Sequence, residues 1–223
     1  MGPGESRHLT TALLVLTFAT GIVDAASFLG LGAVFAAMQT GNVIFLGLGI
    51  AGAAGAPVVA PLVALVSFLG GGAVAALLIR RPPGRMLALG VLVECSLLAA
   101  ATVLSAAADP DPGTTTAYFV IAALSVAMGV RNTLARRVGG ENLATTVLNL
   151  TMAAFTTASP SNLASGADLS QRVAGFAAIL AGAVTGALLV KTDLALALAA
   201  ATAVTLAAGL LQLRARAVEL SPA

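Results

Sequence analysis

Apolar residues run along this chain in stretches of about twenty, and short polar turns separate them. A helix needs about 20 apolar residues to cross the hydrocarbon core of a bilayer. Six stretches have that length and predict six spanning helices, at residues 9–29, 58–79, 86–107, 114–134, 173–190 and 194–213. The fourth qualifies if the flexible stem of Arg131 lets its charge reach the lipid interface. The pattern therefore predicts an all-α polytopic membrane protein.

Two further apolar stretches, 31–54 and 143–157, are interrupted by polar residues. The first carries Gln39-Thr40-Gly41-Asn42 in its middle, and the second is short and changes character near Asn149. Non-helical backbone at membrane depth must be buried in protein or line a wet cavity, because its polar groups need partners. We expect both segments to be re-entrant, with Gly41 permitting the turn in the first. Full crossings by these two segments remain the alternative.

A shift of about 110 residues brings the two halves of the chain into correspondence. Residues 21–25 fall on 129–133, 40–42 fall on 149–151, and 71–80 fall on 182–191. The chain is therefore interpreted as one membrane domain, residues 1–223, built from repeat halves at about 9–108 and 114–213.

The charges predict that the halves are inverted relative to each other. Each loop of one half carries the charge character that its counterpart lacks, and short cytoplasmic loops collect Lys and Arg. With three spans per half and both termini in the cytoplasm, ten of the eleven Lys and Arg residues are cytoplasmic and Lys191 is outside. The expected cytoplasmic anchors are Arg80, Arg81, Arg85, Arg131, Arg136 and Arg137. For the last three, attraction of an anion is the alternative.

Composition excludes most other classes of protein. Hydrophobic residues make up 59% of the chain and charged residues 9%, which cannot cover a water-facing surface. A net charge of +2 is too small to indicate nucleic-acid binding. One cysteine and one histidine provide neither a disulfide nor a metal cluster, and no cofactor or catalytic motif occurs. We therefore expect no metal, no cofactor and no enzyme, and we expect the N-terminal stretch to be a structural element and not a cleaved signal.

Polar residues inside the apolar stretches are the candidate functional residues. Charges in a bilayer are costly and usually face the bundle interior, which draws attention to Asp24 and Glu94. Asp24 could pair with an arginine, cap the broken segment or bind a proton or cation; Glu94 could be a protonation site or a neutral acid bonded between helices. The predicted solute pathway consists of Asp24, Gln39, Thr40, Gly41, Asn42, Asn132, Thr145, Thr146 and Asn149. Hydrogen bonding between helices is the alternative role for these side chains.

Two motifs resemble signatures of a known family. The stretch GIVDAASFLGLGAVFAAMQTGN, residues 21–42, and the stretch AMGVRNTLARRVGGENLATTVLNLT, residues 127–151, resemble the YoaK-like family of bacterial membrane proteins, domain of unknown function 1275. The second motif has Asn149-Leu150-Thr151 where many relatives have a TGT- or TGN-like tripeptide. The resemblance implies a multi-pass protein of the bacterial plasma membrane and adds no substrate.

The leading hypothesis is a transporter or channel for a small polar solute, with its pathway between the two halves. Bulky anions are less favoured, because no Arg or Lys is expected at the membrane midplane. The rival is a non-transporting scaffold or accessory subunit, and a third option is a membrane enzyme using Asp24 and Glu94. The expected partner is the lipid bilayer; the sequence leaves open a homo-oligomer, the substrate, the coupling ion and the direction of transport.

Overall fold

The computed structural model describes residues 3–139 and 166–219, which form helices joined by short connections. The helices are α1 Pro3–Gly30, α2 Gln39–Ile50, α3 Val59–Leu78, α4 Pro83–Ala108, α5 Thr115–Gly139, α7 Gly166–Val190 and α8 Leu194–Glu219. No strand occurs within these ranges. The predicted all-α class is confirmed.

The six predicted spans are also confirmed. Six helices are long and apolar enough to cross a bilayer, over Thr10–Gly30, Val59–Leu78, Pro83–Ala108, Thr115–Arg137, Val173–Val190 and Leu194–Leu213. The only shorter apolar helix in the described part of the chain is α2. The second predicted broken segment, 143–157, lies outside the described residues.

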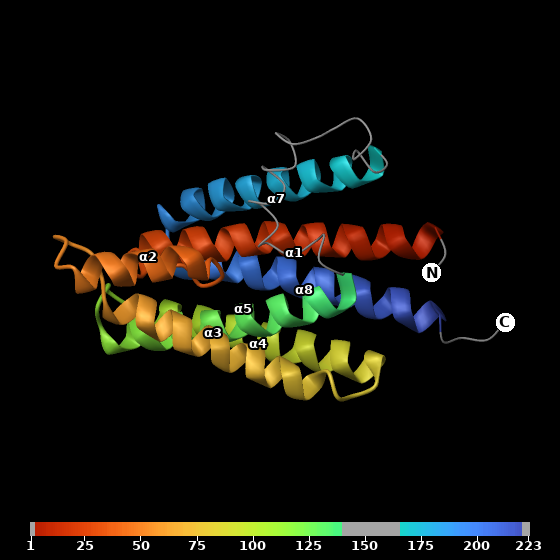
Figure 1. The fold of residues 1–223 in the computed structure, drawn as a ribbon, viewed down its shortest axis with the longest axis horizontal. Helices are drawn as coiled ribbons and strands as arrows, with labels where there is room; N and C mark the ends of the chain where they lie inside the picture. Colours follow the sequence, from red (N-terminus) through yellow and green to blue (C-terminus); the bar gives the residue numbers. More distant parts are fainter. Residues whose placement is uncertain (1–2, 140–165, 220–223) are drawn as a thin grey trace.

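The spanning helices form one elongated bundle with α1 and α5 inside it. About 56% of the α1 span and 61% of the α5 span are buried within the protein, against 11% for α7 and 22% for α3. In Figure 1, α7 lies on one side of α1 and α8, and the α3–α5 group lies on the other. The two central helices are thus shielded by protein, whereas most of α3 and α7 is not buried within it.

Each half of the chain places its third element against the first helix of the other half. Helix α7 packs on α1, and α3 packs on α5. Helix α8 likewise contacts α1, and α4 contacts α5. Exchange of α1 with α5, α3 with α7 and α4 with α8 preserves these helix pairs. This pattern supports the predicted duplication and makes the two halves one interlocked unit.

Glycines permit the contact of α7 with α1 and the contact of α3 with α5, which we call the exchanged contacts. Gly21 of α1 meets Gly182 of α7, and Gly129 of α5 meets Gly71 of α3, at positions that correspond in the repeat. A Cβ added to any of these four residues would collide with backbone atoms of the facing helix. Small residues let membrane helices approach closely, and that approach supplies the packing energy which lipid does not.

Equivalent helices run in opposite directions. Helix α1 leads away from the end of the bundle where both termini lie, and α5 leads back toward it (Figure 1). An inverted repeat requires this relation. Because the counterpart of α2 falls outside the described residues, the inverted relation of the complete halves stays a prediction.

The segment between α1 and α3 begins and ends at the same end of the bundle (Figure 1). Its break lies earlier than predicted, because the chain is non-helical at residues 31–38 and Gln39 already starts α2. The left-handed turn is made by Gly32, with φ of 99°, and by Ala33, with φ of 53°. The expectation that Gly41 permits the turn is therefore wrong. Whether this segment is re-entrant in a bilayer stays a prediction.

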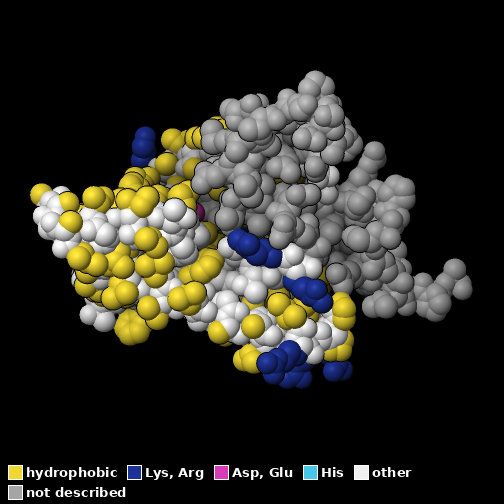
Figure 2. All heavy atoms as spheres, in the orientation of Figure 1, with side chains coloured by type: hydrophobic (Ala, Val, Ile, Leu, Met, Phe, Trp, Pro, Cys, Tyr) yellow, Lys and Arg dark blue, Asp and Glu magenta, His cyan; other side chains and the backbone are white. Residues whose placement is uncertain are grey.

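The surface separates apolar from basic side chains. Hydrophobic side chains cover one half of the face shown in Figure 2, and Lys and Arg gather mainly near the connection from α3 to α4 and the end of α5. Arg80, Arg81, Arg85, Arg136 and Arg137 are all exposed. This end of the bundle also carries the termini, as the predicted orientation requires.

Substitution of one of two adjacent glycines in α3 tests the exchanged contact. Gly71→Ala should lower the free energy of unfolding by about 1–3 kcal/mol, because its new methyl group would overpack the backbone of α5. Gly70→Ala is the matched control, since a Cβ there meets nothing within 4 Å. Unfolding in mixed detergent micelles measures both; equal stability of the two variants would contradict the packing.

Candidate functional site

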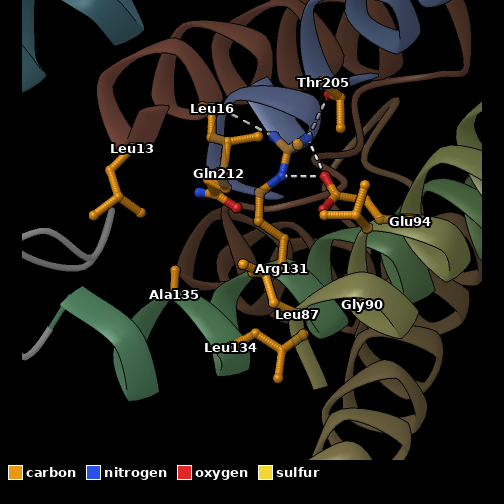
Figure 3. Close-up of a pocket in the computed structure, with 12 residues that line it drawn as sticks. Leu13, Leu16, Leu87, Gly90, Glu94, Arg131, Leu134, Ala135, Thr205 and Gln212 are labelled. Atoms are coloured by element: carbon orange, nitrogen blue, oxygen red, sulfur yellow. Dashed lines mark hydrogen bonds and ion pairs between the residues drawn. The ribbon is translucent and has the colours of Figure 1, made fainter. Parts of the chain in front are cut away.

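A buried arginine lies near the middle of the bundle. Arg131 extends from α5 toward α1, α8 and the Glu94 side chain of α4 (Figure 3). Only 8% of Arg131 and 5% of Glu94 is exposed. Glu94 lies near the middle of the span Pro83–Ala108, so this is a charged site at membrane depth.

Arg131 connects four helices through its guanidinium group. Its Nε and Nη2 atoms donate to Oε1 of Glu94 on α4, and the two side chains form an ion pair. Nη1 donates to the carbonyl oxygen of Leu16 at 3.1 Å and to Oγ1 of Thr20 at 2.9 Å, both on α1. Nη2 also donates to Oγ1 of Thr205 on α8 at 2.7 Å. We call Thr20, Glu94, Arg131 and Thr205 the ion-pair cluster.

The cluster compensates a large desolvation cost. Removing a charged side chain from water costs several kcal/mol per ion even after relaxation, of order 5 kcal/mol. Attraction between the two charges, and the hydrogen bonds that Arg131 donates to the surrounding threonines, offset this cost. Such pairs need excellent geometry to persist, so the four helices are constrained to meet at this point.

Two sequence-based expectations are corrected here. Arg131 does not extend to the interface as an exposed anchor, because its charge is held inside the bundle by Glu94. An arginine inside the bundle was also not expected, yet Arg131 lies there beside Glu94. The opposite charges of Glu94 and Arg131 within two apolar stretches were the signal that would have paired them.

A pocket adjoins the ion pair on the side of the termini. It has a volume of about 40 Å³, enough for about two or three water molecules. Its lining is mostly apolar, with Gln212 as a further polar side chain beside Glu94 and Arg131 (Figure 3). The complete lining is Leu13, Leu16, Leu87, Gly90, Val91, Glu94, Arg131, Leu134, Ala135, Thr205, Gly209 and Gln212.

A second polar cluster holds the non-helical loop before α2. Asp24 Oδ1 accepts a hydrogen bond from the backbone N–H of Ala37 at 2.7 Å, and Ser27 Oγ accepts one from Ala36 at 3.2 Å. These donors precede the N-terminus of α2, where a negative charge is favoured by the helix dipole. Of the three roles considered for Asp24, the structure therefore supports capping of the broken segment.

Asn42 completes this loop cluster from within α2. Its Oδ1 accepts from the N–H of Phe35 at 2.9 Å, and its Nδ2 donates to the carbonyl of Phe35 at 2.6 Å and to Oε1 of Gln39 at 2.8 Å. Gln39 in turn donates to the carbonyl of Ala36 at 2.9 Å. The amide side chains thus replace the backbone partners that a helix would have provided.

The other predicted pathway residues that the structure describes lie outside both clusters. Gly41 gives room to the Phe35 ring, which a Cβ at this position would meet. Thr40 is exposed, and Asn132 accepts a local hydrogen bond from Arg136 at 3.4 Å. Thr145, Thr146 and Asn149 fall outside the described residues. The structure thus brings together Asp24, Gln39 and Asn42, and it does not bring Asn132 to them.

The two acidic candidates occupy different sites. Glu94 is bound to Arg131 and lines the pocket, whereas Asp24 is bound to the loop and does not line it. A membrane enzyme that uses both carboxylates in one cavity therefore loses its support. The expectation of no enzymatic activity stays a prediction.

Six apolar helices around a buried ion pair define an α-helical, multi-pass membrane protein. The chain belongs to the YoaK-like family, because the family described as "Protein of unknown function (DUF1275)" matches residues 12–211. It is 31% identical over 150 residues to the "UPF0700 transmembrane protein YoaK" of Bacillus subtilis (strain 168), covering 67% of each chain. No solved structure matches it. The predicted family is therefore confirmed.

A double-mutant comparison tests the ion pair. Arg131→Leu should lower the free energy of unfolding by about 3–5 kcal/mol, because it leaves Glu94 buried without its partner. Combining it with Glu94→Leu should recover most of this loss, since the double variant buries no charge. Denaturing-detergent titrations measure both. Additive losses in the double variant would show that the two side chains are not coupled.

A second comparison tests the loop cluster. Asn42→Ala should lower the free energy of unfolding by about 1–3 kcal/mol, because it removes the side-chain partners of the N–H and C=O of the half-buried Phe35. Thr40→Ala, two residues earlier on an exposed position, should change stability by less than about 0.5 kcal/mol. Hydrogen exchange at the Phe35 amide provides a local readout. Unchanged protection of that amide in the Asn42 variant would contradict the assignment.

Proposed function

We propose that this protein transports a small polar solute across the bacterial plasma membrane, with both termini in the cytoplasm. The observation that carries the proposal is a buried Glu94–Arg131 pair that faces a pocket near mid-span. Ionisable residues within membrane helices are rare, and they typically mark substrate or proton pathways. The pocket gives a solute access to this pair.

The location of the pair favours a pathway between the halves. Glu94 belongs to the first half and Arg131 to the second, and Thr20 and Thr205 add one residue from each. Secondary transporters built from inverted repeats bind their solutes at such a repeat interface, near the bilayer midplane. Movement of α1, α7 and α8 against α3, α4 and α5 would open and close the site.

The orientation follows from the basic residues. Arg80, Arg81 and Arg85 are exposed at the end of the bundle that carries the termini. Cytoplasmic loops collect Lys and Arg, so this end and the pocket mouth are assigned to the cytoplasm. The pocket would then be the inward-facing part of the pathway.

One observation favours the rival function of a scaffold or accessory subunit. Glu94, Leu16, Thr20 and Thr205 together occupy the guanidinium donors of Arg131, as expected of a cluster that only holds helices together. On that view the pocket is a packing defect. Recovery of a stoichiometric membrane partner, together with impermeable vesicles, would support the rival.

Filling the pocket tests transport. Full-length protein in liposomes should take up at least one solute from a panel of small neutral and charged compounds. Leu87→Trp, which fills the pocket from α4, should slow that uptake about tenfold or more, equivalent to about 1.4 kcal/mol on the barrier. Leu89→Trp on the lipid-facing side of the same helix is the matched control, because Leu89 is 38% exposed. Vesicles impermeable to the whole panel, or equal rates for both variants, would overturn the proposal.

A further inference from the structure

The hydrogen bonds that Arg131 already donates limit how a solute can bind to it. A guanidinium group has five N–H donors. Two point at Glu94, two at α1 and one at Thr205, so the partners account for the whole set. The bonds to α1 end on a helical carbonyl and on a threonine that is itself bonded to that carbonyl. A solute must therefore displace the Glu94 carboxylate, which is the longest and most adjustable of these partners.

The need to leave no buried charge uncompensated then determines which charge the solute carries. Arginine stays protonated in proteins, whereas glutamate can accept a proton. Displacement of Glu94 by a neutral solute would leave two separated buried charges, and a cation would leave the site with an added positive charge. An anion that binds Arg131 while a proton binds Glu94 leaves the net charge of the site unchanged. Among solutes that carry one charge or none, only this exchange avoids the cost of an uncompensated buried charge.

Within the described side chains of the neighbouring helices, no other charge alters this balance. Of the helices packed on α4, α3 has no charged residue in Val59–Leu78, and α8 has none in Leu194–Leu213. Arg136 and Arg137 of α5, and Arg85 of α4 itself, are exposed. Cys95 follows Glu94 on α4, and Asp24 of α1 is bound to the loop. Glu94 is therefore the acidic group available to Arg131.

The shape of the site limits the size of the anion. The pocket measures about 40 Å³ and is lined chiefly by leucine and glycine, so it suits a solute of only a few heavy atoms. The guanidinium fork matches a planar oxyanion, to which it donates two parallel hydrogen bonds. Carboxylates such as formate and inorganic oxyanions such as nitrate both present this edge.

We propose that the pocket beside Arg131 binds a small, planar, singly charged oxyanion together with one proton on Glu94. The anion replaces the Glu94 carboxylate on Arg131, and the proton, taken from the cytoplasmic solution, neutralises the displaced carboxylate. No covalent bond forms other than the O–H bond on Glu94. The assignment of this anion as the transported solute rests on the proposed function, and it narrows the expected small polar solute to a small anion.

Binding to the purified full-length protein in detergent tests the proposal without transport. Nitrate, urea and guanidinium are planar molecules with the same number of heavy atoms and charges of minus one, zero and plus one. Calorimetry in buffers of different ionisation enthalpy should show binding of nitrate with uptake of about one proton per anion, and affinity should rise about tenfold for each pH unit of acidification. Formate should bind like nitrate if the planar pair of oxygen atoms determines recognition. If formate binds and nitrate does not, the ligand class is narrowed to carboxylates. Absence of binding by both anions, or binding of urea or guanidinium with comparable affinity, would overturn the proposal.

Two variants and a control separate the roles of the residues. Glu94→Gln mimics the protonated acid, so it should bind nitrate with no dependence on pH and with no proton uptake. Arg131→Lys keeps a positive charge but loses the planar fork, so it should weaken nitrate binding about tenfold or more. Thr102→Val removes a different contact between α4 and α8, to Thr202, and should leave binding unchanged. Proton uptake that persists in Glu94→Gln would refute the role of Glu94.

Vesicle measurements distinguish failure of this inference from failure of the proposed function. Wild-type vesicles should take up nitrate together with protons, recorded by an internal pH dye, and the rate should not depend on a potassium diffusion potential. Anion binding in detergent with impermeable vesicles would leave the binding site standing and remove transport. Transport of a neutral solute with no anion binding would support the proposed transport and refute the anion site.

Discussion

A charged guanidinium in a medium of low dielectric needs an opposite charge and an acceptor for every N–H group, and this requirement organises the centre of the protein. No single neighbouring helix supplies such a set. Arg131 of α5 obtains it from a carboxylate on α4, a carbonyl and a hydroxyl on α1, and a hydroxyl on α8. The four helices are thus held in one relative arrangement by polar contacts, while α3 and α7 are held against them by close glycine packing.

Helix α1 connects the two polar clusters. Thr20 belongs to the ion-pair cluster, and Asp24 and Ser27 bind the loop before α2. These three residues are separated by four and three positions, so they share one face of the helix. A displacement of α1 along its axis would therefore change the ion-pair cluster and the loop cluster together. Helix α1 thus couples the two clusters.

Long apolar runs allowed the spanning helices to be predicted, because lipid requires a continuous apolar surface about 20 residues long. The loop cluster was predicted only in part. Gln39 and Asn42 were recognised as polar residues in an apolar stretch, but their partners are backbone atoms of residues 35–36, which carry no compositional signal. Arg131 was predicted to be an exposed anchor, and this was wrong for a different reason. Its closeness to Arg136 and Arg137 in the sequence made it resemble a surface anchor, whereas its pairing with Glu94 depends on tertiary contact across 37 residues.

The exchanged packing of α3 and α7 bears on how such a chain could arise. A protein with only one half would leave the glycine face of its first helix, the face occupied here by Gly21 or Gly129, without a protein neighbour. A second copy could cover that face only if it were inserted in the membrane in the opposite orientation. If the halves are inverted repeats, as predicted, an ancestor of half the length would have been a homodimer of oppositely inserted subunits. Duplication and fusion of its gene would then have converted an intersubunit contact into an internal one.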